Sequence, residues 1–216
     1  MDLASPSSLV IRPGLGSVVR VLAGTGAPLT GRTIARLAGV SPAGAAKVLA
    51  TLSRHGVVDS QSAGSANLYR LNREHLLVGP MLALLSTAQR LEANINDELR
   101  GWLVPCDGAI LFGSAARRDG GLDSDLDILL IRPKGVAMTN TVWREQLDST
   151  ADKVKAWTGN ICSWMDYSTP EFVNLMASSD PFVGEVRTDG RWLIEPPPGL
   201  RDIAALQQPS NGSPRW

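Results

Sequence analysis

The sequence predicts an α+β chain of two domains joined by a helix, and three observations carry this prediction. Between residues 17 and 75, two short helix patterns precede a hairpin pattern. From residue 103 onward, two apolar strand patterns flank a turn rich in glycine and polar residues. Charge divides the chain in the same way, because residues 1–75 carry eight Lys/Arg against three Asp/Glu (+5), whereas the remaining 141 residues carry 13 against 18 (−5). Nucleic acid is expected at the basic half, although a solvated surface would give the same excess.

The composition excludes several classes of protein. With 44% hydrophobic and 19% charged residues, the 216-residue chain can bury a core and is not wholly disordered. No apolar stretch approaches the ~20 residues that span a bilayer, and the N-terminus lacks the basic start of a signal peptide. Cys106 and Cys162 lie far apart without nearby histidines, which argues against a disulfide framework or a zinc site. We therefore expect a cytoplasmic protein with no membrane partner.

Composition and periodicity also predict the boundaries along the chain. The Ser/Pro-containing start predicts a flexible N-terminus, apolar residues at helical spacing predict a linking helix, and the Pro-rich, polar end predicts a disordered tail. The predicted segments are a flexible N-terminus at 1–16, a helical domain at 17–75, the linking helix at 76–102, a mixed-sheet domain at 103–195 and the tail at 196–216.

The first domain combines two capped helices with a hairpin. Thr30 can cap one helix, and Ser41 can cap a second that runs to about His55. Strand patterns at 57–60 and 67–71 follow as a hairpin. Two helices with a short turn and a hairpin resemble the winged helix-turn-helix domain of bacterial regulators. The order of elements carries this resemblance more than any single motif does.

The winged-helix resemblance implies that the second helix, Ser41–His55, reads DNA. Lys47 and Arg54 on that helix would contact phosphates, and Arg70 would do so from the wing. Residues 43–46, however, are Ala-Gly-Ala-Ala and offer little to read base edges. Two alternatives stay open, a DNA-binding domain and a module for homodimerisation or protein docking.

The second domain contains a Gly-Ser pair directly after an apolar strand pattern at 109–112. Gly113 permits the backbone to approach a ligand closely, and Ser114 adds a hydroxyl beside backbone N–H groups. A helix that opens after Ser114 would direct its positive end at the same place. These features together are typical of a site for phosphate oxygens.

Two carboxylates begin the next apolar strand pattern. Strand side chains alternate between faces, so Asp125 and Asp127 project from one face. Neighbouring carboxylates on an apolar strand repel each other unless a cation joins them. Magnesium accepts oxygen ligands from carboxylates and from phosphates. Two Mg²⁺ ions about 3.5–4 Å apart would activate a hydroxyl and neutralise a leaving pyrophosphate.

The spacing of these residues resembles a known superfamily. Gly113-Ser114, ten residues and then Asp125-Leu126-Asp127 are similar to the signature of DNA polymerase β-like nucleotidyltransferases. Ala-Ala-Arg after the Gly-Ser pair and Ser124 before the first Asp also match the minimal branch of that superfamily. The resemblance implies a small mixed-sheet enzyme, with Arg117 near the phosphates of a nucleoside triphosphate.

The reaction that the resemblance implies is Mg²⁺-dependent transfer of a nucleoside monophosphate, most simply AMP from ATP, to an acceptor hydroxyl. Members of this branch include antitoxins that modify a toxin, antibiotic modifiers and toxins that act on tRNA. A toxin–antitoxin or regulatory setting is therefore expected. The residues do not choose between a protein, a tRNA and a small molecule as acceptor.

A third carboxylate decides whether the enzyme interpretation is complete. The superfamily places such a carboxylate on the strand that follows the helix predicted at 142–157. That strand is predicted at 161–167, and Asp166 is its only acid. Asp166 is thus the candidate third catalytic residue, although the expected position is nearer Ser163. If Asp166 is structural instead, the domain turns over slowly or not at all. The alternative function is a winged-helix transcriptional regulator whose second domain binds nucleotide or a partner without turnover.

Overall fold

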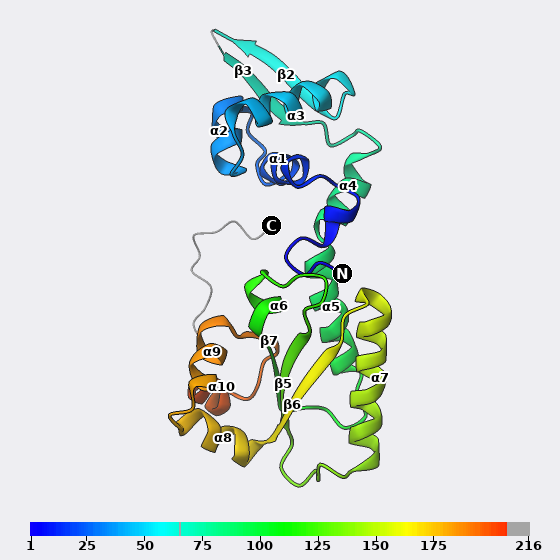
Figure 1. The fold of residues 1–216 in the computed structure, drawn as a ribbon, viewed down its shortest axis with the longest axis vertical. Coiled ribbons are helices and arrows are strands. Elements are labelled where there is room, and N and C mark those ends of the chain that lie inside the picture. Colours follow the sequence, from blue (N-terminus) through cyan, green and yellow to red (C-terminus); the bar gives the residue numbers. More distant parts are fainter. Residues whose placement is uncertain (65, 207–216) are drawn as a thin grey trace. The chain divides into compact units, whose positions relative to one another are not determined.

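The computed structural model describes residues 1–64 and 66–206, which divide into two compact units. Of the described residues, 5–88 form one unit, here the N-terminal unit, and 1–4 with 89–206 form the other, here the C-terminal unit. Both contain helices and strands (Figure 1). A three-stranded sheet belongs to the first unit and a four-stranded sheet to the second. The predicted α+β class is confirmed at this level.

The unit of residues 5–88 packs helices against an antiparallel sheet in the order β1-β3-β2. The Thr30 side chain accepts a hydrogen bond from the Thr33 N–H, and that of Ser41 accepts one from Gly44, so both predicted caps are confirmed. The elements are η1 (Pro6–Leu9), α1 (Pro13–Ala23), β1 (Leu29–Thr30), α2 (Gly31–Leu37), α3 (Pro42–Arg54), β2 (Val58–Ala63), β3 (Ala66–Leu71) and α4 (Val78–Leu85).

The single linking helix predicted at 76–102 is wrong, because two helices occupy this stretch. α4 ends at Leu85 and α5 (Thr87–Arg100) begins after Ser86. The Ser86 hydroxyl donates to the Ala83 carbonyl and the Thr87 hydroxyl to the Leu84 carbonyl. Such side-chain bonds to the backbone compete with helix continuation. No helix in the described ranges has the length and apolar composition needed to cross a membrane.

The second unit is built on a sheet in the order β6-β5-β4-β7. β5 pairs in parallel with β6 and antiparallel with β4, which also pairs antiparallel with β7. The elements after α5 are β4 (Gly108–Phe112), α6 (Gly113–Arg117), β5 (Leu126–Arg132), α7 (Thr141–Thr158), β6 (Cys162–Ser168), α8 (Thr169–Ala177), α9 (Pro181–Asp189), β7 (Arg191–Ile194) and α10 (Pro198–Ala204).

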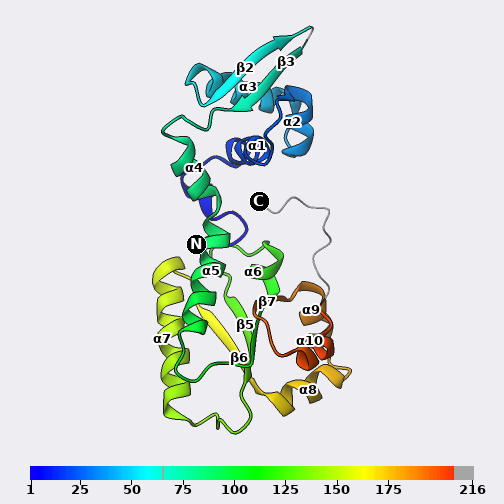
Figure 2. The same ribbon diagram turned by 180° about the vertical axis from the view of Figure 1, so that it is seen from behind.

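Helices cover both faces of this sheet, which explains why β5 is apolar almost throughout (Figure 2). Alternate β5 residues enter two separate cores. One core holds residues of β5, α5 and α7, namely Leu126, Ile128, Leu130, Ile95, Leu99, Trp143 and Val154. The other holds residues of β5, α8 and α9, namely Leu129, Ile131, Phe172, Met176, Val183 and Val186. Asp127 lies two residues before Leu129 on β5 and therefore points to the same face of the sheet as the second core.

Both terminal predictions need correction. The sequence predicts a flexible N-terminus at 1–16, but the Met1 amine donates to Asn160 Oδ1 at 2.6 Å and Leu3 is buried in the C-terminal unit. α1 also begins before the predicted start of its domain, at Pro13. The tail predicted as disordered from 196 contains α10, whose last residue Ala204 is buried against the sheet. Residues 207–216 of that predicted tail lie outside the described part.

Candidate active site

The Gly-Ser pair stands at the junction of β4 and α6. Gly113 has a φ of +67°, which other residues rarely adopt. A Cβ added there would lie 2.8 Å from Asp127 Oδ2. Phe112 and Asp127 are register partners across the antiparallel pair of β4 and β5. The structure thus brings the Gly-Ser pair and the Asp-x-Asp pair together, and glycine is what lets them approach.

Gly113→Ala is expected to destabilise the protein at this site for two reasons. The positive φ strains an alanine, and its Cβ would push against the Asp127 carboxylate. We expect a loss of about 1–3 kcal/mol in the free energy of unfolding, measured by denaturant titration. Gly121→Ala is the control, since no atom lies within 4 Å of its added Cβ. Equal losses in the two variants would contradict this interpretation.

The chain curls tightly around Ser114. The Ser114 carbonyl accepts hydrogen bonds from the N–H groups of Arg118 and Asp119, and Arg118 adopts a left-handed φ of 62°. A Cβ on Gly120 would lie 2.8 Å from Ser114 Oγ. α6 has only five residues, so its dipole contributes little. The hydroxyl and the tightly wound backbone are what Ser114 offers to a phosphate.

Asp125 and Asp127 form the carboxylate pair at the start of β5. Asp125 is exposed and immediately precedes the strand, whereas Asp127 is half-buried as its second residue. Burial and the charge of Asp125 raise the pKa of Asp127. A divalent cation would relieve this repulsion, and carboxylate oxygens are the ligands that Mg²⁺ prefers. The pair therefore fits one such ion.

Ser163 occupies the position beside this pair on the neighbouring strand. It is the register partner of Asp127, and its hydroxyl donates to Asp125 Oδ2 at 3.4 Å. Within the described ranges, no three His, Cys, Asp or Glu residues gather into a group that could hold a metal. The donor set thus fits one Mg²⁺ and supplies no further carboxylate for the second ion that we expected.

The structure does not bring Asp166 to the carboxylate pair. Asp166 pairs with Leu130, three positions beyond Ser163 on β6, so its side chain points to the opposite face of the sheet. There it accepts hydrogen bonds from Trp143 Nε1 at 3.0 Å and from Arg132 Nη1 at 3.4 Å. These contacts fit the alternative interpretation, a structural residue that pairs with a buried arginine.

Asp166→Ala is therefore expected to lower stability without weakening nucleotide binding. It would leave Arg132, whose side chain is 5% exposed, with Glu171 as its remaining ion-pair partner. We expect the free energy of unfolding to fall by roughly 2–3 kcal/mol, below the usual 3–5 because one pair remains. Thermal unfolding and nucleotide titration measure the two properties separately. A variant of normal stability that no longer binds nucleotide would instead place Asp166 in the site.

Arg117 follows Ser114 on α6 and is held by two carboxylates. Its Nε lies 3.0 Å from Asp119 Oδ2, and its Nη1 lies 2.7 Å from Asp189 Oδ2. These bonds raise the pKa of Arg117, which stays charged. Its charge in turn lowers the pKa of Asp127, opposing the larger effects of burial and Asp125. Arg117 thus lies within electrostatic reach of the carboxylate pair.

Asn160 supports the turn that delivers Asp125, a role that the residue patterns do not predict. The buried Asn160 amide donates to the carbonyls of Leu122 at 3.0 Å and Ser124 at 2.9 Å. Nearly forty residues separate the partners, so no local pattern links them. Its position directly after Gly159, which ends α7 in a left-handed turn, is the only local signal.

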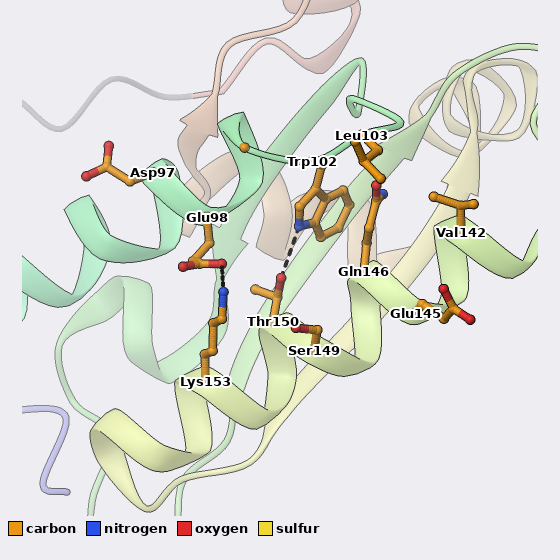
Figure 3. A pocket seen from close by; sticks show the side chains of 11 residues that line it. Asp97, Glu98, Trp102, Leu103, Val142, Glu145, Gln146, Ser149, Thr150 and Lys153 are labelled. Atoms are coloured by element: carbon orange, nitrogen blue, oxygen red, sulfur yellow. Dashed lines mark hydrogen bonds and ion pairs between the residues drawn. The ribbon is translucent and has the colours of Figure 1, made fainter.

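A cleft of about 330 Å³ lies between α5 and α7 (Figure 3). Glu98 and Lys153 face each other across it, and Trp102 donates to Thr150 on its inner wall. Its lining includes neither the Gly-Ser pair nor the Asp-x-Asp pair. This cleft is therefore separate from the candidate active site.

The residues predicted to contact DNA lie on the N-terminal unit. Lys47 and Arg54 are exposed on α3 and stand seven residues apart, on one face of the helix. Arg70 on β3 is also exposed but lies 3.6 Å from Asp59. The exposed face of α3 thus carries two positive charges, and the charge of Arg70 is partly compensated.

Comparisons with known proteins add little to these observations. No family model and no curated protein matches the chain. Among solved structures, the chain is similar to a mutant MntA–HpeT toxin–antitoxin structure, with 19% identity and a TM-score of 0.37 over 53% of this chain and 80% of that one. It is also similar to a toxin–antitoxin structure with AMP-PNP, with 20% identity and a TM-score of 0.36 over the same shares. Likenesses this weak do not assign an activity, so the function is inferred from the site's residues.

Proposed function

We propose that the C-terminal unit binds a nucleoside triphosphate with Mg²⁺ and transfers its nucleoside monophosphate, most simply AMP from ATP, to an acceptor hydroxyl. The observation that carries the proposal is the close approach of Gly113 to Asp127, 2.8 Å from an added Cβ to Oδ2. This approach brings the Gly-Ser turn next to a pair of carboxylates that repel each other. Metal-dependent phosphate chemistry uses both of these features at one point.

The chain's own residues have distinct roles in this proposal. Asp125 and Asp127 hold the metal, and the Ser114 hydroxyl with its neighbouring backbone N–H groups holds phosphate oxygens. Arg117 contacts the phosphates once it leaves its carboxylate partners. Bound Mg²⁺ supplies neutralisation of the charge that develops on the phosphates.

Ser163 suggests that turnover is slow. The strand position beside Asp127 carries a hydroxyl in place of a carboxylate, so the site lacks a general base there. Nucleotide binding with slow transfer agrees with this arrangement. A toxin–antitoxin setting, which the resemblance implies, remains part of the proposal, and the residues do not identify the acceptor.

Incubation with labelled nucleotides, Mg²⁺ and a cell lysate tests the proposal. We expect label to transfer to a lysate component with the wild type, and not with the Asp125→Ala/Asp127→Ala double variant. No transfer by the wild type together with no Mg²⁺-dependent nucleotide binding would refute it. Transfer by both proteins at equal rates would also refute it.

We propose a second function, DNA binding by a winged helix in the N-terminal unit, because α3 exposes Lys47 and Arg54 on one face with no acid on that helix. These cations would contact phosphates. Affinity for DNA from the protein's own promoter region should fall steeply with salt, and Lys47→Ala/Arg54→Ala should reduce the salt slope by about 2. Absence of binding at moderate salt would leave dimerisation or protein docking as the role of this unit.

A further inference from the structure

Arg117 and Asp189 form an ion pair beside the candidate nucleotide site. Asp189 Oδ2 lies 2.7 Å from Arg117 Nη1, and Asp119 Oδ2 lies 3.0 Å from Arg117 Nε. Within residues 1–64 and 66–206, Arg117 is the one cation that an ion pair joins to Asp189. The arginine expected to contact phosphates is thus already engaged by carboxylates from two segments.

Asp189 is the rigid member of this pair. It is the last residue of α9, where the helix dipole disfavours a carboxylate that has no cation. A Cβ on the next residue, Gly190, would collide with the Val186 carbonyl and would lie 3.0 Å from Ile110 Cγ2, so the backbone there is closely packed. β7 follows at once, with Arg191 paired to Leu111. The Asp189 backbone is therefore held in place if Arg117 moves, and the short side chain gives the carboxylate little reach to follow.

Arg117 is the partner that can move. Its side chain is 42% exposed, against 17% for Asp189, and it extends from the end of the short helix α6. A guanidinium binds phosphate oxygens with the same N–H groups that it offers to carboxylates. The two aspartates occupy the Nε–H and one N–H of Nη1, so a triphosphate reaches this edge of the guanidinium only by displacing them.

On the basis of the proposed nucleotide site, we propose that Asp189 is an internal competitor of the triphosphate. It holds Arg117 in the nucleotide-free protein and loses this partner when phosphates bind. Nucleotide binding then leaves a fixed carboxylate unpaired beside an anionic ligand, which weakens affinity and speeds release. Asp189 acts through Arg117 and is a residue that sets affinity, not one that touches the reacting atoms.

Titration with a non-hydrolysable ATP analogue and Mg²⁺ tests this competition in the full chain, with inorganic triphosphate as a second probe. Asp189→Asn should bind both probes about three- to ten-fold more tightly, the range for a partly exposed charge-assisted pair. Asp119→Asn should give a smaller gain, because the Asp119 side chain is 58% exposed. Glu185→Gln is the matched control, since it removes the same charge from an exposed position of α9 and should change affinity less than twofold.

The double variant Asp189→Asn/Arg117→Ala separates competition from a general charge effect. If Arg117 is the intermediary, Asp189→Asn should tighten binding less than twofold in the Arg117→Ala background. Weaker or unchanged binding by folded Asp189→Asn would overturn the competition, and weaker binding would make Asp189 a residue that positions Arg117. If the wild type binds the analogue and Asp127→Asn does not, the proposed function stands even when the competition fails. If folded wild type and Asp189→Asn both fail to bind, both proposals fail.

Discussion

Asp127→Asn is expected to abolish Mg²⁺-dependent nucleotide transfer while it stabilises the metal-free protein. Burial and Asp125 raise the pKa of Asp127, so the fold favours its protonated form. A raised pKa means that ionised Asp127 costs stability, and that stability falls as the pH rises through its folded pKa. Asparagine removes this cost at neutral pH. Transfer should fall at least about 100-fold, since even the outer-shell partners of a metal account for 10–100-fold.

Thermal unfolding with and without Mg²⁺ checks both halves of this prediction. The wild type should gain stability on addition of Mg²⁺ because the ion binds only the folded state, whereas Asp127→Asn should not. Asp123→Asn is the control, because Asp123 is exposed in the preceding turn. An Asp127→Asn protein that is less stable than the wild type in the absence of metal, or that keeps its Mg²⁺ response, would contradict the interpretation of the pair.

Ser163→Asp is expected to raise activity by adding the carboxylate that the pair lacks. Residue 163 is the register partner of Asp127, and its side chain already reaches Asp125 Oδ2. A third carboxylate there would provide ligands for a second ion and a base for the acceptor hydroxyl, worth roughly 10²-fold in transfer rate. Without metal, the same charge adds repulsion and should lower the unfolding temperature.

Met165→Asp is the matched control for this gain. It adds the same charge to the same face of β6, two residues further along and opposite Leu129. Only Ser163→Asp should bind Mg²⁺ more tightly than the wild type and transfer the nucleotide faster. If the two variants behave alike, or if transfer by Ser163→Asp stays at the wild-type level, Ser163 does not limit turnover.

Several features of this chain could be predicted from local patterns. The caps at Thr30 and Ser41 and the strand that ends before Gly113 depend on neighbouring residues, and they were found. The break at Ser86 also has a local cause, since the hydroxyls of Ser86 and Thr87 bond to the preceding turn. The apolar spacing continues through it, however, and therefore predicts one helix.

The sequence alone determined the two halves of the candidate site, since strand alternation puts Asp125 and Asp127 on one face and Gly-Ser needs only its own turn. Tertiary structure alone decided which other groups join them. Register across the parallel strands placed Ser163 beside Asp127 and sent Asp166 to the other face, where it pairs with Arg132. The packing of α9 brought Asp189 to Arg117 across seventy-two residues. Such contacts depend on strand register and helix packing, which no local run of residues encodes.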